Sequence, residues 1–393
     1  MKNRETTTSF WLENVDEKAR AGRLVTPRGC VDTPLFMPVA TQGSVKALDP
    51  EDLESVGAGL VLGNAYHLYL RPGVEIISNL GGLHRFMGWN GPILTDSGGF
   101  QGFSLKHLRE INEHGITFRS HIDGSTHVIT PESIIDVQEK LCSDIMMPLD
   151  VCLPHDADEE LVSAGISRTN RWMERCIESR TNTNQILFGI VQGGLFKDLR
   201  RQSVEFMNNL DMPGYSIGGL SVGESKSKMY EITDLTAGLL PKEKPRYLMG
   251  VGAPEDIVEC VARGIDMFDC VLPTRVARNG ALFTSGGRIN ITAAKFKNFD
   301  GPVEMGCHCY CCKRFSVAYL NHLFRAREYL AYRLASIHNL SFIFQLMAEI
   351  RSSIVKGEFE NYRNCFWSKY RVSDESVKTQ QREKWESSDR TGA

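Results

Sequence analysis

Short apolar runs recur through the first three quarters of the 393-residue chain, and each run is bounded by Gly, Pro or Asp. Most of these runs are continuous rather than alternating, which is typical of parallel strands that are buried on both faces. The pattern predicts eight strands. Their residue ranges are 34–40, 59–65, 92–95, 144–149, 186–191, 214–219, 246–251 and 265–268.

Helix-like segments separate many of these runs. Strands that alternate with helices indicate βα units, so eight candidate strands predict a (β/α)8 TIM barrel, with a doubly wound sheet as the alternative. The segment 116–130 alternates and contains Asp-Gly, which predicts a hairpin inserted in a loop. The predicted helices cover residues 131–142, 158–179, 197–210, 225–240 and 254–263.

The composition is that of a globular protein with a sizeable core, since 42% of the residues are hydrophobic and 24% are charged. The net charge of −3 indicates that any nucleic-acid contact comes from a local basic patch, for which the segment 313–333 is a candidate. The amino-terminal segment has no apolar signal region, and no stretch approaches the roughly 18 apolar residues of a membrane span. We therefore expect a cytoplasmic protein with no membrane contact.

Four of the eleven cysteines lie between residues 307 and 312, a density that favours a metal site over disulfides or free thiols. Cys307, Cys309 and Cys312 form the pattern C-x-C-x-x-C. Thiolates together with an imidazole suit a tetrahedral structural zinc ion. Spacing alone leaves the fourth ligand open among His308, Cys311, His322 and His338.

Polar residues and glycines lie where several predicted strands end. The carboxyl ends of barrel strands form one mouth, which is where catalytic groups of such barrels lie. Asp269 ends the last run, and we predict that an arginine-bearing loop follows Pro273. Arginines there can hold phosphates of an anionic substrate while the carboxylate reacts. The strand-end residues are Asp96, Asp150, Gln192, Gly219 and Asp269.

A pair of carboxylates can divide nucleophilic attack and proton transfer between them. In retaining glycosidases one carboxylate forms a covalent glycosyl intermediate while the other transfers the proton. Asp96 and Asp269 are the candidates for this pair, and the spacing does not decide which does which. The structural alternatives are a helix cap for Asp150, a satisfied buried amide for Gln192 and tight turns for the glycines.

The motifs TDSGGFQ at 95–101 and GIDMFDCVLPTRVARNG at 264–280 resemble the active site of the tRNA-guanine transglycosylases, which exchange a guanine base in transfer RNA. The resemblance covers nearly the whole chain and implies a barrel with an inserted zinc subdomain. It also selects His338 as the fourth ligand of one structural Zn2+ per subunit. The expected divisions are a catalytic barrel at 1–300, a zinc-binding subdomain at 301–345, a closing helix of the barrel at 346–370 and a disordered polar tail at 371–393.

Carried over position by position, the resemblance implies that Asp269 is the nucleophile and Asp96 the general acid/base. Phe100 and Met249 would sandwich the base. The implied base-binding residues are Asp96, Ser97, Gly98, Gly99, Phe100, Asp150, Gln192, Gly219, Leu220 and Met249. The implied RNA-binding residues are Gly250, Val251, Gly252, Ala253, Pro254, Glu255, Asp256, Thr274, Arg275, Val276, Ala277 and Arg278.

The family implies replacement of guanine 34 by preQ1 (7-aminomethyl-7-deazaguanine) through a covalent aspartyl-ribosyl-RNA intermediate, in queuosine biosynthesis. The implied partners are tRNA-Asp, -Asn, -His and -Tyr with a GUN anticodon, and a second copy in a homodimer. Cys152 and Val222 agree with the bacterial, preQ1-inserting pattern, whereas Ser221 resembles the eukaryotic, queuine-inserting pattern.

Other members of the fold offer further alternatives. These are direct queuine insertion, a non-catalytic partner subunit, an archaeal-type enzyme and a generic barrel glycosidase. The presence of both Asp96 and Asp269 argues against the partner subunit, because a scaffold has no need of the pair.

Overall fold

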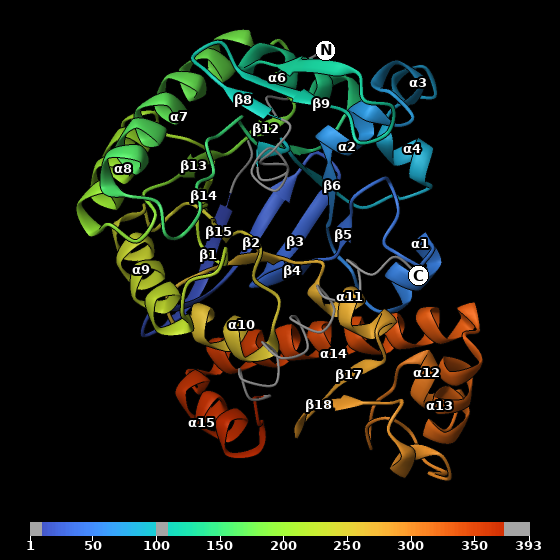
Figure 1. The fold of residues 1–393 in the computed structure, drawn as a ribbon. Coiled ribbons are helices and arrows are strands. Elements are labelled where there is room, and N and C mark those ends of the chain that lie inside the picture. Colours follow the sequence, from blue (N-terminus) through green and yellow to red (C-terminus); the bar gives the residue numbers. More distant parts are fainter. Residues whose placement is uncertain (1–9, 100–108, 373–393) are drawn as a thin grey trace, which may run out of the picture. The chain divides into compact units, whose positions relative to one another are not determined.

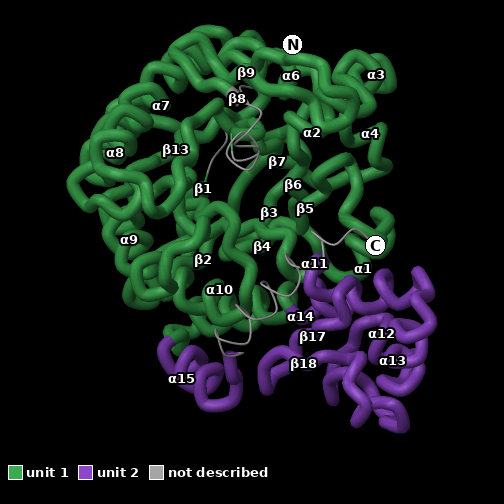
Figure 2. The backbone as a smooth tube through the Cα atoms, viewed as in Figure 1, with its two compact units in different colours: residues 1–273, 343–359 green, residues 274–342, 360–393 purple. Residues whose placement is uncertain are grey.

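The structure is a computed structural model that describes residues 10–99 and 109–372 and divides the chain into two compact units. The first unit comprises residues 1–273 and 343–359, and the second comprises residues 274–342 and 360–393 (Figure 2).

Parallel strands form the centre of the first unit (Figure 1). Nearly all of their residues are buried, which explains the continuous apolar runs of the sequence. In chain order the strands are β4 (Leu35–Met37), β5 (Val39–Ala40), β6 (Val61–Asn64), β7 (Ile93–Asp96), β11 (Ile145–Met146), β12 (Ile186–Leu187), β13 (Gly189–Val191), β14 (Tyr215–Ile217), β15 (Arg246–Leu248) and β16 (Met267–Asp269).

These strands close into a ring. The hydrogen-bonded order is β12-β11-β7-β6-β5 in one half and β13-β14-β15-β16-β4 in the other. A single residue separates β4 from β5 and β12 from β13, and pairing continues across both breaks. The Leu62 N–H donates to the Pro38 carbonyl at 3.0 Å, and the Phe188 N–H donates to the Met146 carbonyl at 3.1 Å. The predicted eight-stranded barrel is confirmed, and the doubly wound alternative is wrong.

Inward-pointing side chains of the strands fill the barrel as one apolar cluster. Phe188 and Tyr247 are its aromatic members, and both are fully buried. The filled interior leaves the carboxyl ends of the strands as the place where polar groups can gather.

Helices lie outside the strands (Figure 1). The five predicted helices are confirmed, and the capping box between Thr130 and Ser133 starts the first of them. They are α6 (Pro131–Leu141), α7 (Glu159–Ser179), α8 (Lys197–Asn209), α9 (Lys226–Leu239) and α10 (Pro254–Val261). Shorter helices are α1 (Pro50–Ser55), α2 (Ala65–Leu70), α3 (Val74–Asn79) and α4 (Leu83–Met87).

Two antiparallel sheets are added to the barrel. The predicted hairpin is confirmed as β9 (Ile116–Arg119) and β10 (Thr126–Ile129), and β8 (Arg109–Ile111) adds a strand that we did not predict. A second, unpredicted sheet consists of β1 (Phe10–Asp16), β2 (Ala19–Thr26) and β3 (Gly29–Thr33). It lies at the amino end of the barrel, because Arg20 of β2 donates to Asp266, directly before β16, at 3.1 Å.

The second unit contains a β-ribbon and several helices. The chain crosses between the units three times, and two of these boundaries fall within the long helix α14 and at the start of α15. The elements are β17 (Ala281–Thr284), β18 (Gly287–Asn290), the 3-10 helix η2 (Ala294–Phe296), α12 (Tyr310–Arg314), α13 (Val317–Ala326), α14 (Tyr329–Lys356) and α15 (Phe359–Lys369). The domain boundaries of the sequence analysis stay predictions, and the tail from residue 373 lies outside the described residues.

One local prediction is wrong. The arginine-bearing loop after Asp269 is a helix, α11 (Leu272–Arg278). Pro273 is compatible with this helix because it lies in the first turn, where a missing N–H breaks no hydrogen bond. Among the described residues, no helix combines the length and the apolar character that crossing a membrane requires.

Candidate active site and metal centre

The strand-end residues singled out in the sequence gather at one end of the barrel. Asp96 and Asp269 are the last residues of β7 and β16. Gln192 directly follows β13, and Gly219 lies two residues after β14. Asp150 lies four residues after β11. Parallel strands of a barrel place all these ends on the same rim.

Asp150 and Gln192 form a hydrogen-bonded polar pair at this end of the barrel. The Gln192 Nε2 donates to Asp150 Oδ2 at 2.6 Å, and both residues are buried. A Cβ added at Gly99 would lie 2.1 Å from Asp150 Oδ1, and one added at Gly219 would lie 2.5 Å from Gln192 Oε1. A side chain at either position would displace the polar pair, and Gly219, with a φ of +66°, also has a backbone conformation that favours glycine. Burial raises the pKa of Asp150 to about 6, while the hydrogen bond from Gln192 opposes this increase.

Asp96 is a carboxyl group whose protonation is balanced near neutral pH. Burial, followed by repulsion from Asp150 and Asp269, raises the pKa of Asp96 to about 7. The Asn64 Nδ2 donates to Asp96 Oδ2 at 2.9 Å, which fixes the orientation of the carboxyl group. A group with this pKa can both donate and accept a proton at neutral pH.

Asp269 has a different environment. The Tyr247 hydroxyl donates to Asp269 Oδ1 at 2.6 Å, and the Gly250 N–H donates to the same oxygen at 2.9 Å. Burial raises the pKa of Asp269, while these two hydrogen bonds oppose the increase. Within the described part of the chain no hydrogen bond reaches Oδ2, so this oxygen is available to a substrate. Burial and the neighbouring Asp269 raise the pKa of Tyr247 well above its usual value, which keeps its hydroxyl a donor.

The loop after β14 presents a backbone carbonyl. The Ser221 N–H and the Val222 N–H both donate to the Glu224 carboxylate, at 2.5 and 3.0 Å. Because the Ser221 N–H turns toward Glu224, the Leu220 carbonyl of the same peptide group points the opposite way. The Ser221 hydroxyl also donates to the Gly250 carbonyl at 3.2 Å, which connects this loop to the one that supports Asp269.

The segments proposed to bind RNA differ in exposure. Gly250 is exposed, whereas Glu255 is buried and pairs with Lys226 at 2.8 Å. On α11, in the second unit, Arg275 is exposed, and Arg278 is half-buried and donates to its own helix. Burial and repulsion from Arg275 lower the pKa of Arg278.

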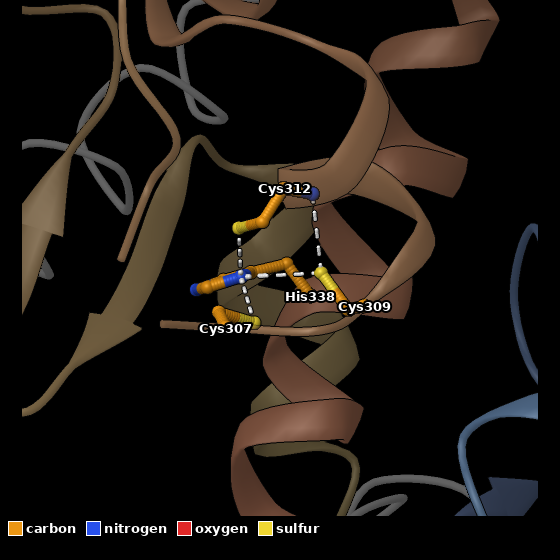
Figure 3. Close-up of side chains that lie close together, drawn as sticks. All are labelled: Cys307, Cys309, Cys312 and His338. Atoms are coloured by element: carbon orange, nitrogen blue, oxygen red, sulfur yellow. Dashed lines mark hydrogen bonds between the residues drawn. The ribbon is translucent and has the colours of Figure 1, made fainter. Parts of the chain in front are cut away.

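Four side chains of the second unit form a cluster that could hold a metal ion. The ligand atoms of Cys307, Cys309, Cys312 and His338 all lie within 4.8 Å of one another, and Figure 3 shows that they converge. The His338 Nδ1 lies 3.8, 3.7 and 3.3 Å from the three sulfurs in that order. The His338 Nε2 lies 2.8 Å from the Phe283 carbonyl, to which its N–H donates, leaving Nδ1 for a ligand bond.

This geometry selects His338 from the four candidates of the sequence. Cys311 is buried and lies outside the group, as do His308 and His322. Within this cluster, hydrogen bonds with Cys309 and Cys312 lower the pKa of Cys307, whereas hydrogen bonds with Cys307 and Cys312 raise the pKa of Cys309.

Two residues that contact the strand-end carboxylates were not predicted from the sequence, and one predicted residue cannot be described. Phe100 lies outside the described residues. The sequence pattern did not mark Tyr247 as a functional residue, because Tyr247 lies inside an apolar run. Asn64 is the polar last residue of β6, so the strand-end rule that found Asp96 could have found it.

The chain is similar to known proteins along nearly its whole length. The family model described as "Queuine tRNA-ribosyltransferase" matches residues 16–372. A protein of that name from Dehalococcoides mccartyi (strain BAV1) is 54% identical over 379 residues, which cover 96% of this chain and 97% of the relative. Proteins of the same name from Dictyoglomus turgidum and Herpetosiphon aurantiacus are 54% and 52% identical, each aligned over 94% of this chain and over 96% and 94% of their own lengths.

Proposed function

The chain belongs to the queuine tRNA-ribosyltransferase family, and from this premise we propose that it replaces guanine 34 of transfer RNA with preQ1 in queuosine biosynthesis. The observation that carries the proposal is the pair of half-buried strand-end carboxylates, Asp96 and Asp269, in different surroundings. Asp96 has a pKa near 7, whereas Asp269 has one oxygen fixed by two donors and the other available. Such a pair can divide proton transfer and nucleophilic attack.

In the first half of the proposed reaction, Asp269 Oδ2 attacks C1′ of nucleotide 34. The bond between C1′ and N9 of guanine breaks, and the departing base takes the proton of Asp96. The hydrogen bonds from Tyr247 and Gly250 to Oδ1 stabilise the carboxylate before attack and orient its free oxygen toward the ribose. The product is an ester between Asp269 and the RNA.

In the second half, the incoming base replaces water as the acceptor. Asp96, now ionised, takes the N9 proton of preQ1, and N9 attacks C1′ and releases Asp269. The proton balance over both halves is zero, because Asp96 donates one proton and regains one. Exchange therefore needs no proton from solvent.

The buried polar pair of Asp150 and Gln192 suits recognition of a guanine-like base. Asp150 would accept from N1–H and the exocyclic amine, while the Gln192 amide and the Gly219 N–H would donate to the carbonyl oxygen. The Leu220 carbonyl would accept from the aminomethyl group of preQ1. Met249 would contact one face of the ring, and Phe100 is proposed for the other.

Formation of the covalent intermediate should depend on pH through Asp96. The raised pKa means that the acid form dominates below about pH 7 and is lost above it. We expect the single-turnover rate of adduct formation to fall about tenfold per pH unit on the alkaline side. Capture of the adduct by preQ1 should instead rise as Asp96 ionises. Equal pH profiles for the two half-reactions would contradict this role.

The size of the base is proposed to be limited by Val222 and Cys152. A bulky side chain excludes a substituent by overlap, and such discrimination is typically worth 10–200-fold. Val222→Gly should therefore raise incorporation of queuine by about tenfold or more while leaving preQ1 incorporation within about twofold. Val222→Ile provides the matched control and should not admit queuine. If Val222→Gly left queuine incorporation unchanged, the gate would lie elsewhere.

Direct queuine insertion is the second candidate, and Ser221 favours it. The Ser221 hydroxyl holds the Gly250 carbonyl at 3.2 Å and so stands beside the proposed pocket. The same chemistry would apply, with a larger incoming base.

The metal ion is proposed to be zinc. In a tetrahedron with Zn–S of about 2.3 Å and Zn–N of about 2.0 Å, sulfur and nitrogen are about 3.5 Å apart. The three observed distances from His338 Nδ1 to the cysteine sulfurs, 3.3–3.8 Å, lie on either side of that value. Bound zinc would have four protein ligands and no open position, so it would stabilise the second unit and supply no step of the reaction.

The partners follow from the proposed reaction. They are tRNA-Asp, -Asn, -His and -Tyr with a GUN anticodon, guanine and preQ1, and a second copy of the chain in a cytoplasmic homodimer. The residues proposed for RNA contact are 250–256 and 274–278, with exposed Arg275 as the cationic member on α11.

The proposed specificity can be tested by mapping the modified nucleotide. Incubation with tRNA-Tyr and preQ1, followed by nuclease digestion and mass spectrometry, should place preQ1 at position 34. The same transcript with adenine at position 34 should stay unmodified, because Gln192 and Asp150 would not match its edge. Incorporation at another position would contradict the proposal.

A further inference from the structure

Arg200, on the first turns of α8, is a fully buried cation for which the catalytic scheme above has no use. Burial lowers the pKa of Arg200 to about 10, so the side chain is still charged at neutral pH. Three backbone carbonyls accept its N–H groups, those of Gly194 at 3.0 Å, Val191 at 3.2 Å and Gly219 at 3.5 Å. The Val191 carbonyl ends β13, and the other two carbonyls lie in the loops after β13 and β14, which carry Gln192 and Gly219.

A second side chain of α8 contacts the same peptide group. The Gln192 N–H donates to the Ser203 hydroxyl at 3.1 Å, while the Val191 carbonyl accepts from Arg200. Arg200 and Ser203 are three residues apart and therefore on one face of the helix. The two polar atoms of the Val191–Gln192 peptide are thus held from one helix, and this peptide sets the direction in which the Gln192 side chain leaves the backbone.

The loop lies directly against this helix. A Cβ added at Gly193, which has a φ of +139°, would lie 2.9 Å from the Arg200 backbone nitrogen and 3.0 Å from its Cδ. The close approach brings the guanidinium group beneath the Gly194 and Gly219 carbonyls. A buried cation held by carbonyls is costly compared with an apolar side chain of similar size. The buried charge of Arg200 is better explained by the order that it imposes on the loops after β13 and β14 than by a gain in stability of the fold.

We propose that Arg200, with Ser203, is a positioning residue that aims the Gln192 amide and the Gly219 N–H at the C6 carbonyl of the purine. The inference rests on the proposed function, because it needs a guanine-like base in the pocket. In this proposal, α8 determines how well the site discriminates between bases that carry the C6 carbonyl and bases that lack it. Substitution of Arg200 or Ser203 should loosen the donors of Gln192 and Gly219. Recognition of N1–H and the amine by Asp150 should stay in place.

Competition for exchange of labelled guanine, with guanine and 2-aminopurine as competitors, measures this discrimination. 2-Aminopurine lacks both the C6 carbonyl and the N1–H of guanine. Because Asp150 is unchanged in these variants, a change in the ratio of the two inhibition constants relative to the wild type reports the contact with the C6 carbonyl. In Arg200→Met the ratio should fall at least tenfold while the Kd for tRNA stays within twofold. Arg200→Lys should recover part of the ratio. Arg201→Met, a change at the neighbouring exposed arginine, should match the wild type.

Ser203→Ala provides an independent arm, because it removes one hydroxyl and keeps the buried charge. It should lower the ratio at least threefold, even if Arg200→Met does not fold. An unchanged ratio in folded Arg200→Met, or in Ser203→Ala, would overturn the inference. So would an equal fall in Arg201→Met. A wild-type protein that exchanges no guanine would instead refute the proposed function, which separates the two failures.

Discussion

Asp269→Asn is expected to abolish the covalent enzyme–RNA adduct and to lower base exchange by at least about 10⁴-fold, as removal of an enzymic nucleophile does. The amide cannot form the ester with C1′. Its shape still allows hydrogen bonds at the position of Oδ1, where Tyr247 and Gly250 donate. Binding of tRNA should therefore stay within about threefold of the wild type. Adduct is measured on a denaturing gel after incubation with labelled tRNA.

The matched control for this change is Asp198→Asn, since the Asp198 side chain is 88% exposed on α8. It should form adduct at the wild-type rate. A denaturant-resistant adduct in Asp269→Asn would exclude Asp269 as the nucleophile and would direct attention to Asp96. Loss of tRNA binding together with activity would indicate that Asp269 supports the fold and would not test its chemistry.

Cys309→Ala is expected to remove the metal ion and to destabilise the second unit by on the order of 5 kcal/mol, a part of the about 10–16 kcal/mol that structural zinc supplies to zinc-finger peptides. Three ligands remain, but an open tetrahedral site holds zinc less tightly. Metal content by mass spectrometry and thermal unfolding measure the two effects. Proteolysis should begin within the second unit, because the site lies there.

Cys311→Ala serves as the control, because Cys311 is buried on the same short helix and lies outside the cluster. It should keep one metal ion per chain and lose only about 1 kcal/mol of stability, as expected for a small cavity. A full complement of metal in Cys309→Ala would contradict the assigned ligand set. Equal metal loss in both variants would indicate that Cys311 is needed for metal binding as well as Cys309.

The barrel was predictable because its strands are buried on both faces and appear as continuous apolar runs. The helices between them carry a clear period, and Thr130 marks the start of α6. The N-terminal sheet was missed because exposed and buried residues along β1 follow no strict alternation. The loop predicted after Asp269 proved to be a helix, since Pro273 is as compatible with a first turn as with a break.

The candidate site was partly predictable for a similar reason. Asp96 and Asp269 are carboxylates at the ends of apolar strands, which a sequence displays directly. Tyr247 contacts Asp269, 22 residues further along the chain, and Arg200 contacts carbonyls that are 6 to 19 residues away. No local pattern of the sequence displays either contact. Arg200 looks like any helix arginine beside Arg201 in the sequence, and burial alone separates the two. His338 could not be selected by spacing, because convergence with the cysteines depends on how α14 packs in the second unit.

Base exchange can be tested by the release of labelled guanine from position 34 of tRNA-Tyr, with preQ1 and queuine offered in parallel. We expect that preQ1 drives release and that queuine does not. Release driven by queuine alone would keep the proposed chemistry and overturn the role given to Val222 and Cys152. No release with either base would contradict base exchange itself and would favour a non-catalytic partner subunit.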